Sequence, residues 1–168
     1  WRADSHPAST TDPLDDDSDD DGILDGNEDA DHDGLRDSTE TDPNDADTDD
    51  DLLFDGTEIG LTEPQGTGTD PMAGHFFSDS DPSTNTDPCD SDTDDDGIGD
   101  GAEDADRDGL RDGTETDPLN HDTDGDMLPD GLEIGLTAST NDPGTNEASP
   151  NWRADSHPAS TTDPLDDD

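Results

Sequence analysis

The stretch Asp17-Ser18-Asp19-Asp20-Asp21-Gly22-Ile23-Leu24-Asp25-Gly26-Asn27-Glu28 carries the pattern that decides the fold. Counted as a twelve-residue loop, it has acidic side chains at positions one, three, five, nine and twelve and glycine at position six. This is the ligand spacing of a calcium loop, in which the first three carboxylates converge, position seven offers its carbonyl and the last glutamate closes the site. Only oxygen ligands are offered, which favours a hard cation over zinc or copper.

The same pattern occurs six times along the chain. Loops 1 to 6 span residues 17–28, 29–40, 47–58, 92–103, 104–115 and 122–133. Position six is glycine in four of the loops but Leu52 in loop 3 and Met127 in loop 6. Because a side chain at this point strains a turn that favours glycine, we expect these two loops to bind more weakly or to bend differently. Six copies in phase favour ion binding over a merely solvated acidic surface.

Each loop contributes six predicted calcium ligands, with position seven acting through its main-chain carbonyl. These ligands are Asp17, Asp19, Asp21, Ile23, Asp25, Glu28, Asp29, Asp31, Asp33, Leu35, Asp37, Glu40, Asp47, Asp49, Asp51, Leu53, Asp55, Glu58, Asp92, Asp94, Asp96, Ile98, Asp100, Glu103, Asp104, Asp106, Asp108, Leu110, Asp112, Glu115, Asp122, Asp124, Asp126, Leu128, Asp130 and Glu133. Ligands that bridge ions of neighbouring loops are predicted at Asp15, Asp42, Asp90 and Asp117.

The composition also requires a cation. The chain has 53 acidic residues against five basic ones and a formal charge of −48. Leu, Ile and Phe together make up only 19 of the 168 residues, a balance that ordinarily means disorder. No conventional apolar core can offset the chain entropy and the repulsion between carboxylates. We therefore expect six or more Ca²⁺ ions in each 151-residue repeat and folding that depends on metal.

The sequence repeats at two levels. Residues 12–62 align without gaps to 87–137 and are identical at 37 of 51 positions, and residues 152–168 are identical to 1–17. The predicted organisation is a connector at 1–11, a calcium-binding half-repeat at 12–62, a Gly/Pro/Ser/Thr-rich connector at 63–86, a second half-repeat at 87–137, a connector at 138–162 and the start of a further repeat at 163–168. Such arrays bury surface mainly between neighbouring repeats, so neighbouring copies are the expected partners.

The expected fold is a mostly irregular rod stapled by calcium. The loops abut, which leaves no room for flanking helices, and no apolar pattern of helical period or strict alternation is present. We expect single helical turns at residues 25–28 and the equivalent places, little regular helix or sheet, and no conventional hydrophobic core. The apolar side chains at position seven are predicted to pack in small clusters between the ion sites.

The tandem Asp-x-Asp-x-Asp-Gly-x-x-Asp-x-x-Glu units and the Thr-Asp-Pro steps at 41–43 and 116–118 resemble thrombospondin type 3 calcium repeats in their prokaryotic form. The resemblance covers residues 12–62 and 87–137. It implies a chain wrapped around a line of calcium ions and used as a stalk or spacer in secreted and surface proteins. Animal members carry disulfides, whereas this chain has only Cys89, which we interpret as a packed residue rather than a reactive thiol or interchain bridge.

Other functions fit the sequence less well. The five histidines are scattered and suggest no catalytic constellation, so we expect no enzyme activity. A polyanion of this density repels nucleic acid, and no apolar stretch is long enough to enter a membrane. The aromatic residues Trp1, Phe76, Phe77 and Trp152 lie just before each new half-repeat, and we predict that they fix one half-repeat against the next, with stacking on sugars as the alternative.

Hydroxyl side chains beside prolines in the connectors are typical of O-glycosylated stalks, although an ordinary polar linker has the same composition. The candidate glycosylation sites are Ser9, Thr10, Thr11, Ser83, Thr84, Thr86, Ser160, Thr161 and Thr162. Attached glycans would then be a second class of partner.

These observations predict a non-catalytic extracellular or cell-surface protein, a calcium-stabilised rod in a surface filament or stalk. The millimolar calcium outside cells suits the weak affinities of such modules, roughly 10⁻⁴ to 10⁻³ M. The alternatives are a spacer within a surface adhesin and a disordered acidic protein that buffers calcium or nucleates mineral. Binding that saturates with a gain of structure indicates a rod, whereas a buffer binds without ordering.

Overall fold

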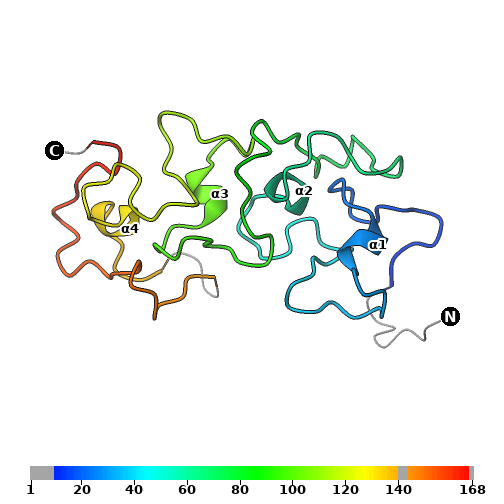
Figure 1. Cartoon of the computed structure of the whole chain (residues 1–168), viewed down its shortest axis with the longest axis horizontal. Coiled ribbons are helices and arrows are strands. Elements are labelled where there is room, and N and C mark those ends of the chain that lie inside the picture. The colour runs from blue at the N-terminus through cyan, green and yellow to red at the C-terminus, as the bar shows by residue number, and fades with distance from the viewer. Residues whose placement is uncertain (1–9, 140–143, 167–168) are drawn as a thin grey trace.

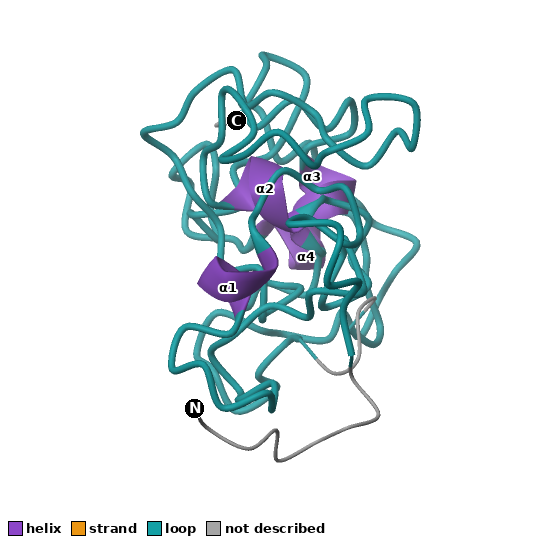
Figure 2. Cartoon of the chain, turned by 90° about the vertical axis from the view of Figure 1, so that its right-hand side faces the viewer, coloured by secondary structure: helices purple, strands orange, loops and turns teal. Residues whose placement is uncertain are grey.

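The computed structural model describes residues 10–139 and 144–166. Over these ranges the chain is mostly loop, with four single-turn helices: α1 (Asp25–Glu28), α2 (Asp55–Glu58), α3 (Asp100–Glu103) and α4 (Asp130–Glu133). The four helices follow one another along the long axis of the molecule, as Figure 1 shows. Viewed along that axis, they lie near the middle with the loops around them (Figure 2). The expectation of little regular secondary structure is confirmed.

Each helix occupies positions nine to twelve of its calcium-type loop, in loops 1, 3, 4 and 6. Loops 2 and 5 have turns and bends over the equivalent residues 37–40 and 112–115. The prediction of a helical turn in each loop is therefore right for four loops and wrong for two. The two groups also differ in sequence: the four helical loops have Ser or Thr at position two, and the other two have Ala30 and Ala105.

All six loops share one backbone curl, with a positive φ at positions four and six. At position six the φ values are 97° for Gly22, 77° for Gly34, 88° for Leu52, 99° for Gly97, 73° for Gly109 and 85° for Met127. Leu52 and Met127 thus adopt the conformation of the glycines, and the expectation of a different bend is wrong. Holding a side chain in this left-handed region costs about 1–2 kcal/mol per residue.

Two hydrogen bonds within each loop hold this curl. The position-one carboxylate accepts the N–H of position six, as Asp92 does from Gly97 at 3.0 Å. The position-five carboxylate accepts the N–H of position seven, as Asp96 does from Ile98 at 2.8 Å. The same pair recurs in the other five loops. In five of the loops the second oxygen of the position-one carboxylate also accepts a main-chain N–H, as Asp92 does from Asp96 at 3.1 Å, so this carboxylate holds the turn from both sides.

The interior of the molecule is acidic rather than apolar. Among the described residues only Ile23, Ala46, Leu53 and Ile98 are buried apolar side chains, against eighteen buried Asp and Glu. The predicted burial of the position-seven side chain is confirmed for Ile23, Leu53 and Ile98 but is wrong for Leu110 and Leu128, which are 36% and 37% exposed. The absence of a conventional core is confirmed for the described chain.

The connectors fold back on the first loop of the half-repeat that precedes them. Thr69 donates to a carboxylate oxygen of Asp17, and Thr145 donates to Asp92 in the same way. The rings of Phe76 and Trp152 lie so close to Gly22 and Gly97 that a Cβ on either glycine would be 2.5 or 2.1 Å from a ring carbon. The prediction that these aromatic residues fix a half-repeat against the next one is corrected: they fasten each connector to its own half-repeat.

Two further expectations concern cysteine and membranes. Cys89 is half-buried, and its thiol lies 3.4 Å from the carbonyl oxygen of Glu40. Burial raises the pKa of this thiol, which makes it less reactive. In the part of the chain that the structure describes, no helix has the length and apolar character needed to cross a membrane.

Candidate metal centre

Loops 1, 3, 4 and 6 contact one another in sequence and form one row along the molecule. A Cβ built on Gly56 in loop 3 would lie 2.1 Å from the carbonyl oxygen of Asp21 in loop 1. The Gly101 N–H in loop 4 donates to Asp51 in loop 3 at 2.7 Å, and the Gly131 N–H in loop 6 donates to Asp96 in loop 4 at 2.9 Å. We call these four the axial loops, and loops 2 and 5 the side loops.

The predicted ligands at positions one, three and five come together in three axial loops. In each of loops 1, 3 and 4, one oxygen from each of the three carboxylates lies within 4.8 Å of the other two. In side loop 2 the corresponding group consists of Asp29, Asp31 and Glu40. Oxygen atoms at this spacing are the donors that Ca²⁺ takes in proteins, so the chemistry of the donor set fits the ion.

The position-nine aspartate of the axial loops has a role that the ligand pattern did not reveal. In loop 4 the Asp100 carboxylate accepts both the N–H and the hydroxyl of Thr93, at 2.9 and 2.5 Å. Asp25 and Asp55 accept the same two bonds from Ser18 and Thr48. These bonds tie the start of the loop to the start of its helix. The hydroxyl residue at position two was the sequence signal for this arrangement.

Many carboxylate oxygens of the axial loops are buried without a hydrogen-bond partner. Among the described residues there are thirteen such side-chain atoms, and twelve belong to the axial loops. The twelve are in Asp17, Asp19, Asp21, Glu28, Asp49, Glu58, Asp94, Glu103 (both oxygens), Asp124, Asp130 and Glu133, and the thirteenth is in Asp79. A buried anionic oxygen without a partner is costly, so these atoms are candidate ligands for a metal ion.

The pKa values of these groups show the same cost. Burial, reinforced by neighbouring carboxylates, raises the pKa of Asp21 to about 8 and of Glu28 to about 9. In loop 4, burial raises the pKa of Asp94 to about 9 and of Glu103 to about 11. The charged forms are destabilised because these groups are removed from water and lie beside other carboxylates. A bound cation would reverse this effect by stabilising the charged forms.

The side loops use their last glutamate differently. In loop 5 the two oxygens of Glu115 accept the N–H groups of Ala105 and Asp112, at 3.0 and 2.8 Å. Glu40 accepts two main-chain N–H groups of loop 2 in the same way. The arginine at position eight, Arg36 or Arg111, donates from Nε to the main-chain carbonyl of that glutamate. In the side loops both oxygens of the last glutamate therefore have main-chain partners, whereas each axial glutamate keeps at least one buried oxygen without a partner.

A carboxylate group also links two axial loops. One oxygen from each of Asp21, Glu28 and Asp55 lies within 4.8 Å of the others, and all three side chains are buried. This group was not among the predicted bridging ligands. Of the predicted bridging ligands, Asp42 and Asp117 each accept the N–H of the residue two positions later and so cap turns. Asp15 is exposed. Asp90 is partly buried, and this burial raises its pKa.

Threonines that follow the axial loops hold the buried glutamates. Thr41 donates to Glu28 at 3.0 Å, Thr86 to Glu58 at 2.9 Å and Thr162 to Glu133 at 2.7 Å. Two of these threonines are among the candidate glycosylation sites, and their hydroxyls are engaged in the structure. Thr10, Ser83, Thr84, Ser160 and Thr161 are exposed, whereas Thr11 is half-buried and Ser9 lies outside the described residues.

Comparison with known proteins gives no match: no family model, no curated protein and no solved structure is significantly similar to this chain.

Proposed function

We propose that this protein is a calcium-stabilised structural rod and that its axial loops are its main ion sites. The twelve buried, unpartnered carboxylate oxygens of these loops carry the proposal. They are concentrated in the four loops that contact one another along the molecule, so ions held there would cancel charge where the chain packs most tightly. The side loops, whose glutamates have main-chain partners, would bind more weakly.

In each axial loop, positions one, three, five and twelve would hold the ion, and the side chains at positions three and twelve offer buried oxygens without a hydrogen-bond partner in all four loops. The bound cation supplies positive charge to neutralise those oxygens. The chain supplies the rest: position two fixes the position-nine aspartate, the curl at positions four and six points the carboxylates inward, and a following threonine fixes the glutamate. The arrangement holds ions and presents no group for chemical turnover, so the proposed role is structural.

The resemblance to thrombospondin type 3 repeats supports an extracellular or cell-surface setting, in a filament or stalk. Weak sites, with dissociation constants of roughly 10⁻⁴ to 10⁻³ M, fill in millimolar calcium. At free calcium tenfold above its dissociation constant, one site contributes about 1.4 kcal/mol to stability. Several sites in series are therefore enough to order a chain that has almost no apolar core.

The test is a calcium titration of the metal-free chain at neutral pH, followed by circular dichroism, small-angle scattering and calorimetry. The rod predicts saturable binding of at least four ions, with compaction and protease resistance that rise together with occupancy. Magnesium serves as a control, because it needs a small octahedral site and keeps its water. Binding without any gain of structure would instead support the calcium buffer, and a chain that keeps its shape in excess chelator would refute the proposed function.

A further inference from the structure

The three contacts between axial loops follow one rule. In each, the position-five aspartate of one loop lies on the position-ten glycine of the next. A Cβ on Gly56, Gly101 or Gly131 would come within 2.1 to 2.5 Å of the aspartate's carbonyl oxygen. These three glycines are buried, and larger residues would not fit there. We call this arrangement the axial joint.

The joint also buries the apolar residue at position seven of the first loop. Ile23, Leu53 and Ile98, which each precede a joint, are 3%, 3% and 7% exposed. At loop 6, where the row ends, Leu128 is 37% exposed and Met127 beside it is 87% exposed. Asp126, the position-five residue of this loop, is exposed as well. Loop 6 thus presents the first half of a joint whose second half is absent from this row.

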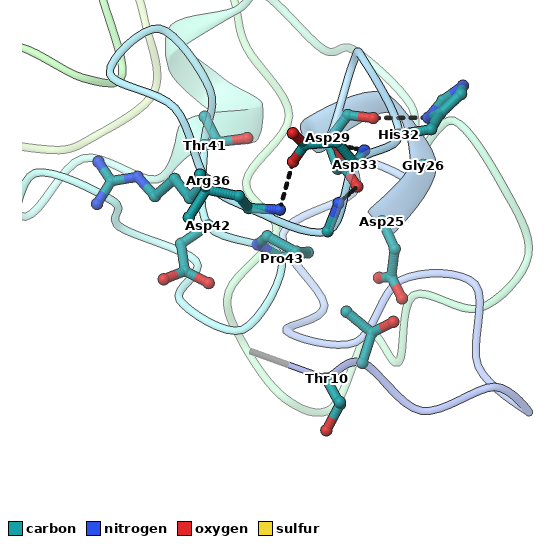
Figure 3. A pocket seen from close by; sticks show the side chains of 13 residues that line it. Thr10, Asp25, Gly26, Asp29, His32, Asp33, Arg36, Thr41, Asp42 and Pro43 are labelled. Atoms are coloured by element: carbon teal, nitrogen blue, oxygen red, sulfur yellow. Dashed lines mark hydrogen bonds between the residues drawn. The ribbon is translucent and has the colours of Figure 1, made fainter. Parts of the chain in front are cut away.

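The opposite end of the row presents the second half. Gly26 is the position-ten glycine of loop 1, and it is exposed. A Cβ built on it meets no atom of the described chain within 4 Å. Gly26 and Asp25 border an open hollow of about 490 Å³ whose lining also includes Thr10 and Thr11 (Figure 3). The N-terminal end of the row therefore has space where each interior glycine has a neighbouring loop.

The segment that leaves loop 6 already follows the path that leads into a joint. Residues 152–166 have the sequence of 1–15. Thr162 donates to Glu133 as Thr86 donates to Glu58, and the Asp155 N–H donates to Leu136 as the Asp79 N–H donates to Leu61. After Thr86 the chain enters loop 4, which docks on loop 3. A second copy that continues from this segment would bring its loop 1 to loop 6.

We propose that the molecule propagates head to tail through a fourth axial joint, in which Gly26 of one copy docks on Asp126–Leu128 of the preceding copy. The Gly26 N–H donates to the Asp126 carboxylate, as Gly101 does to Asp51 and Gly131 does to Asp96. Asp25 of the incoming copy completes with Asp126 and Glu133 a carboxylate group like that of Asp21, Glu28 and Asp55. The partner is a second copy of this chain, and the inference rests on the proposed function because the joint would hold a cation.

The test uses a two-copy chain at the natural period, residues 1–151 followed by 1–168, with Gly26→Val in either the first or the second copy. Gly26 has no positive φ, so valine is compatible with its backbone. In the first copy the substitution faces solvent, and in the second it lies in the joint. The two variants have the same composition and the same loops, so only the location of the valine differs.

In calcium, the parent chain should show slow amide exchange at the second-copy Gly26, on the order of 100-fold slower than at the first-copy Gly26. Scattering should give one straight rod. The second-copy variant should lose the protection of neighbouring amides and bend between copies, while the first-copy variant should behave like the parent.

Equal exchange at both Gly26 amides, or equal behaviour of the two variants, would overturn the joint. The calcium function would survive that result as long as both copies still order on calcium addition. If neither copy orders with calcium, the proposed function fails as well, so the two failures are distinguishable.

Discussion

The axial and side loops start from the same twelve-residue pattern and reach different ends. In axial loop 4, Thr93 fixes Asp100, a helical turn follows, and the buried Glu103 has the hydroxyl of Thr116 beside it but accepts no main-chain N–H. In side loop 5, Ala105 replaces the threonine, no helix forms, and Glu115 accepts main-chain N–H groups. The difference shows that the ligand spacing defines which ion a loop could bind. The residues between the ligands decide how many carboxylate oxygens are left without a hydrogen-bond partner.

The largest expected difference comes from the last glutamate of each kind of loop. In calcium, Glu103→Gln should cost about 3 kcal/mol of stability, because it removes the carboxylate charge that would pair with a calcium ion in a buried site. The matched change Glu115→Gln should cost only about 1 kcal/mol of stability, because it weakens two hydrogen bonds from main-chain N–H groups. Thermal unfolding at fixed calcium measures both.

In excess chelator the order of these two variants should reverse. Burial raises the pKa of Glu103 to about 11, so at pH 8 the metal-free chain must protonate this group in order to fold. Glu103→Gln removes that penalty, so this variant should then be more ordered than the parent at pH 8. Equal losses in calcium for the two glutamates would contradict the division into axial and side loops.

The second prediction concerns pH in the metal-free chain. The folded-state pKa values of the axial carboxyls are raised, to about 8 for Asp21 and Asp100 and about 9 for Glu28, whereas the unfolded values lie near 4. Below pH 4 both states are protonated and burial carries no ionisation penalty. As pH rises from 4 to about 9 the unfolded chain releases protons that the folded chain keeps, so the fold loses stability over this window.

Without metal, therefore, the chain should be more compact at pH 4.5 than at pH 8, and calcium should restore compaction at pH 8. In the presence of calcium, acidification should instead weaken calcium binding, because protons compete with the ion for the same carboxylate oxygens. Circular dichroism and scattering across the pH range test both statements. Metal-free order that increases with pH would show that the axial carboxyls are not buried as described.

A smaller effect is expected from the hydroxyl at position two. Thr93→Val keeps the shape of the side chain but removes the hydroxyl bond to Asp100, at a cost of about 2 kcal/mol because the acceptor is charged. The reverse change in the side loop, Ala105→Thr, should bring little gain, since Asp112 is exposed and no helix starts there. If Ala105→Thr stabilised loop 5 as much as Thr93→Val weakened loop 4, the hydroxyl alone would account for the difference between the two loop types.

The smallest predicted effect lies at position six. Met127 has a φ of 85° and is 87% exposed, so Met127→Gly should relieve backbone strain without loss of packing and stabilise the chain by about 1 kcal/mol. Met127→Ala is the control, because it shortens the side chain but keeps the Cβ that causes the strain. Calorimetry at saturating calcium should separate the two variants, and an equal response would attribute the effect to side-chain exposure instead.

Much of the local structure could be predicted from the sequence. The spacing of Asp92, Asp94 and Asp96 predicted their convergence, and the structure brings them together. The scarcity of apolar residues predicted a chain without a conventional core. The convergence depends on hydrogen bonds from side chains to the main chain within one twelve-residue loop, and the lack of a core depends on composition alone. Both can therefore be predicted without knowing how the loops pack.

What the sequence could not show is which loops would meet. Loop 1 packs on loop 3, although loop 2 lies between them in the sequence, and Asp21 joins Glu28 and Asp55 across that contact. Likewise, Phe76 and Trp152 pack on glycines more than fifty residues earlier in the chain. Such contacts depend on how the connectors fold back, and the sequence repeats do not encode that path in any local pattern.

By itself, then, the sequence determined the acidic loops, their curl and the donor set that could hold a cation, because carboxylate spacing and net charge are properties of the chain before it folds. Only the tertiary structure decided which carboxylates are buried and unpartnered, since burial arises when one loop covers another. It is this covering, with an aspartate of one loop on a glycine of the next, that separates the four axial loops from two side loops with nearly the same sequence.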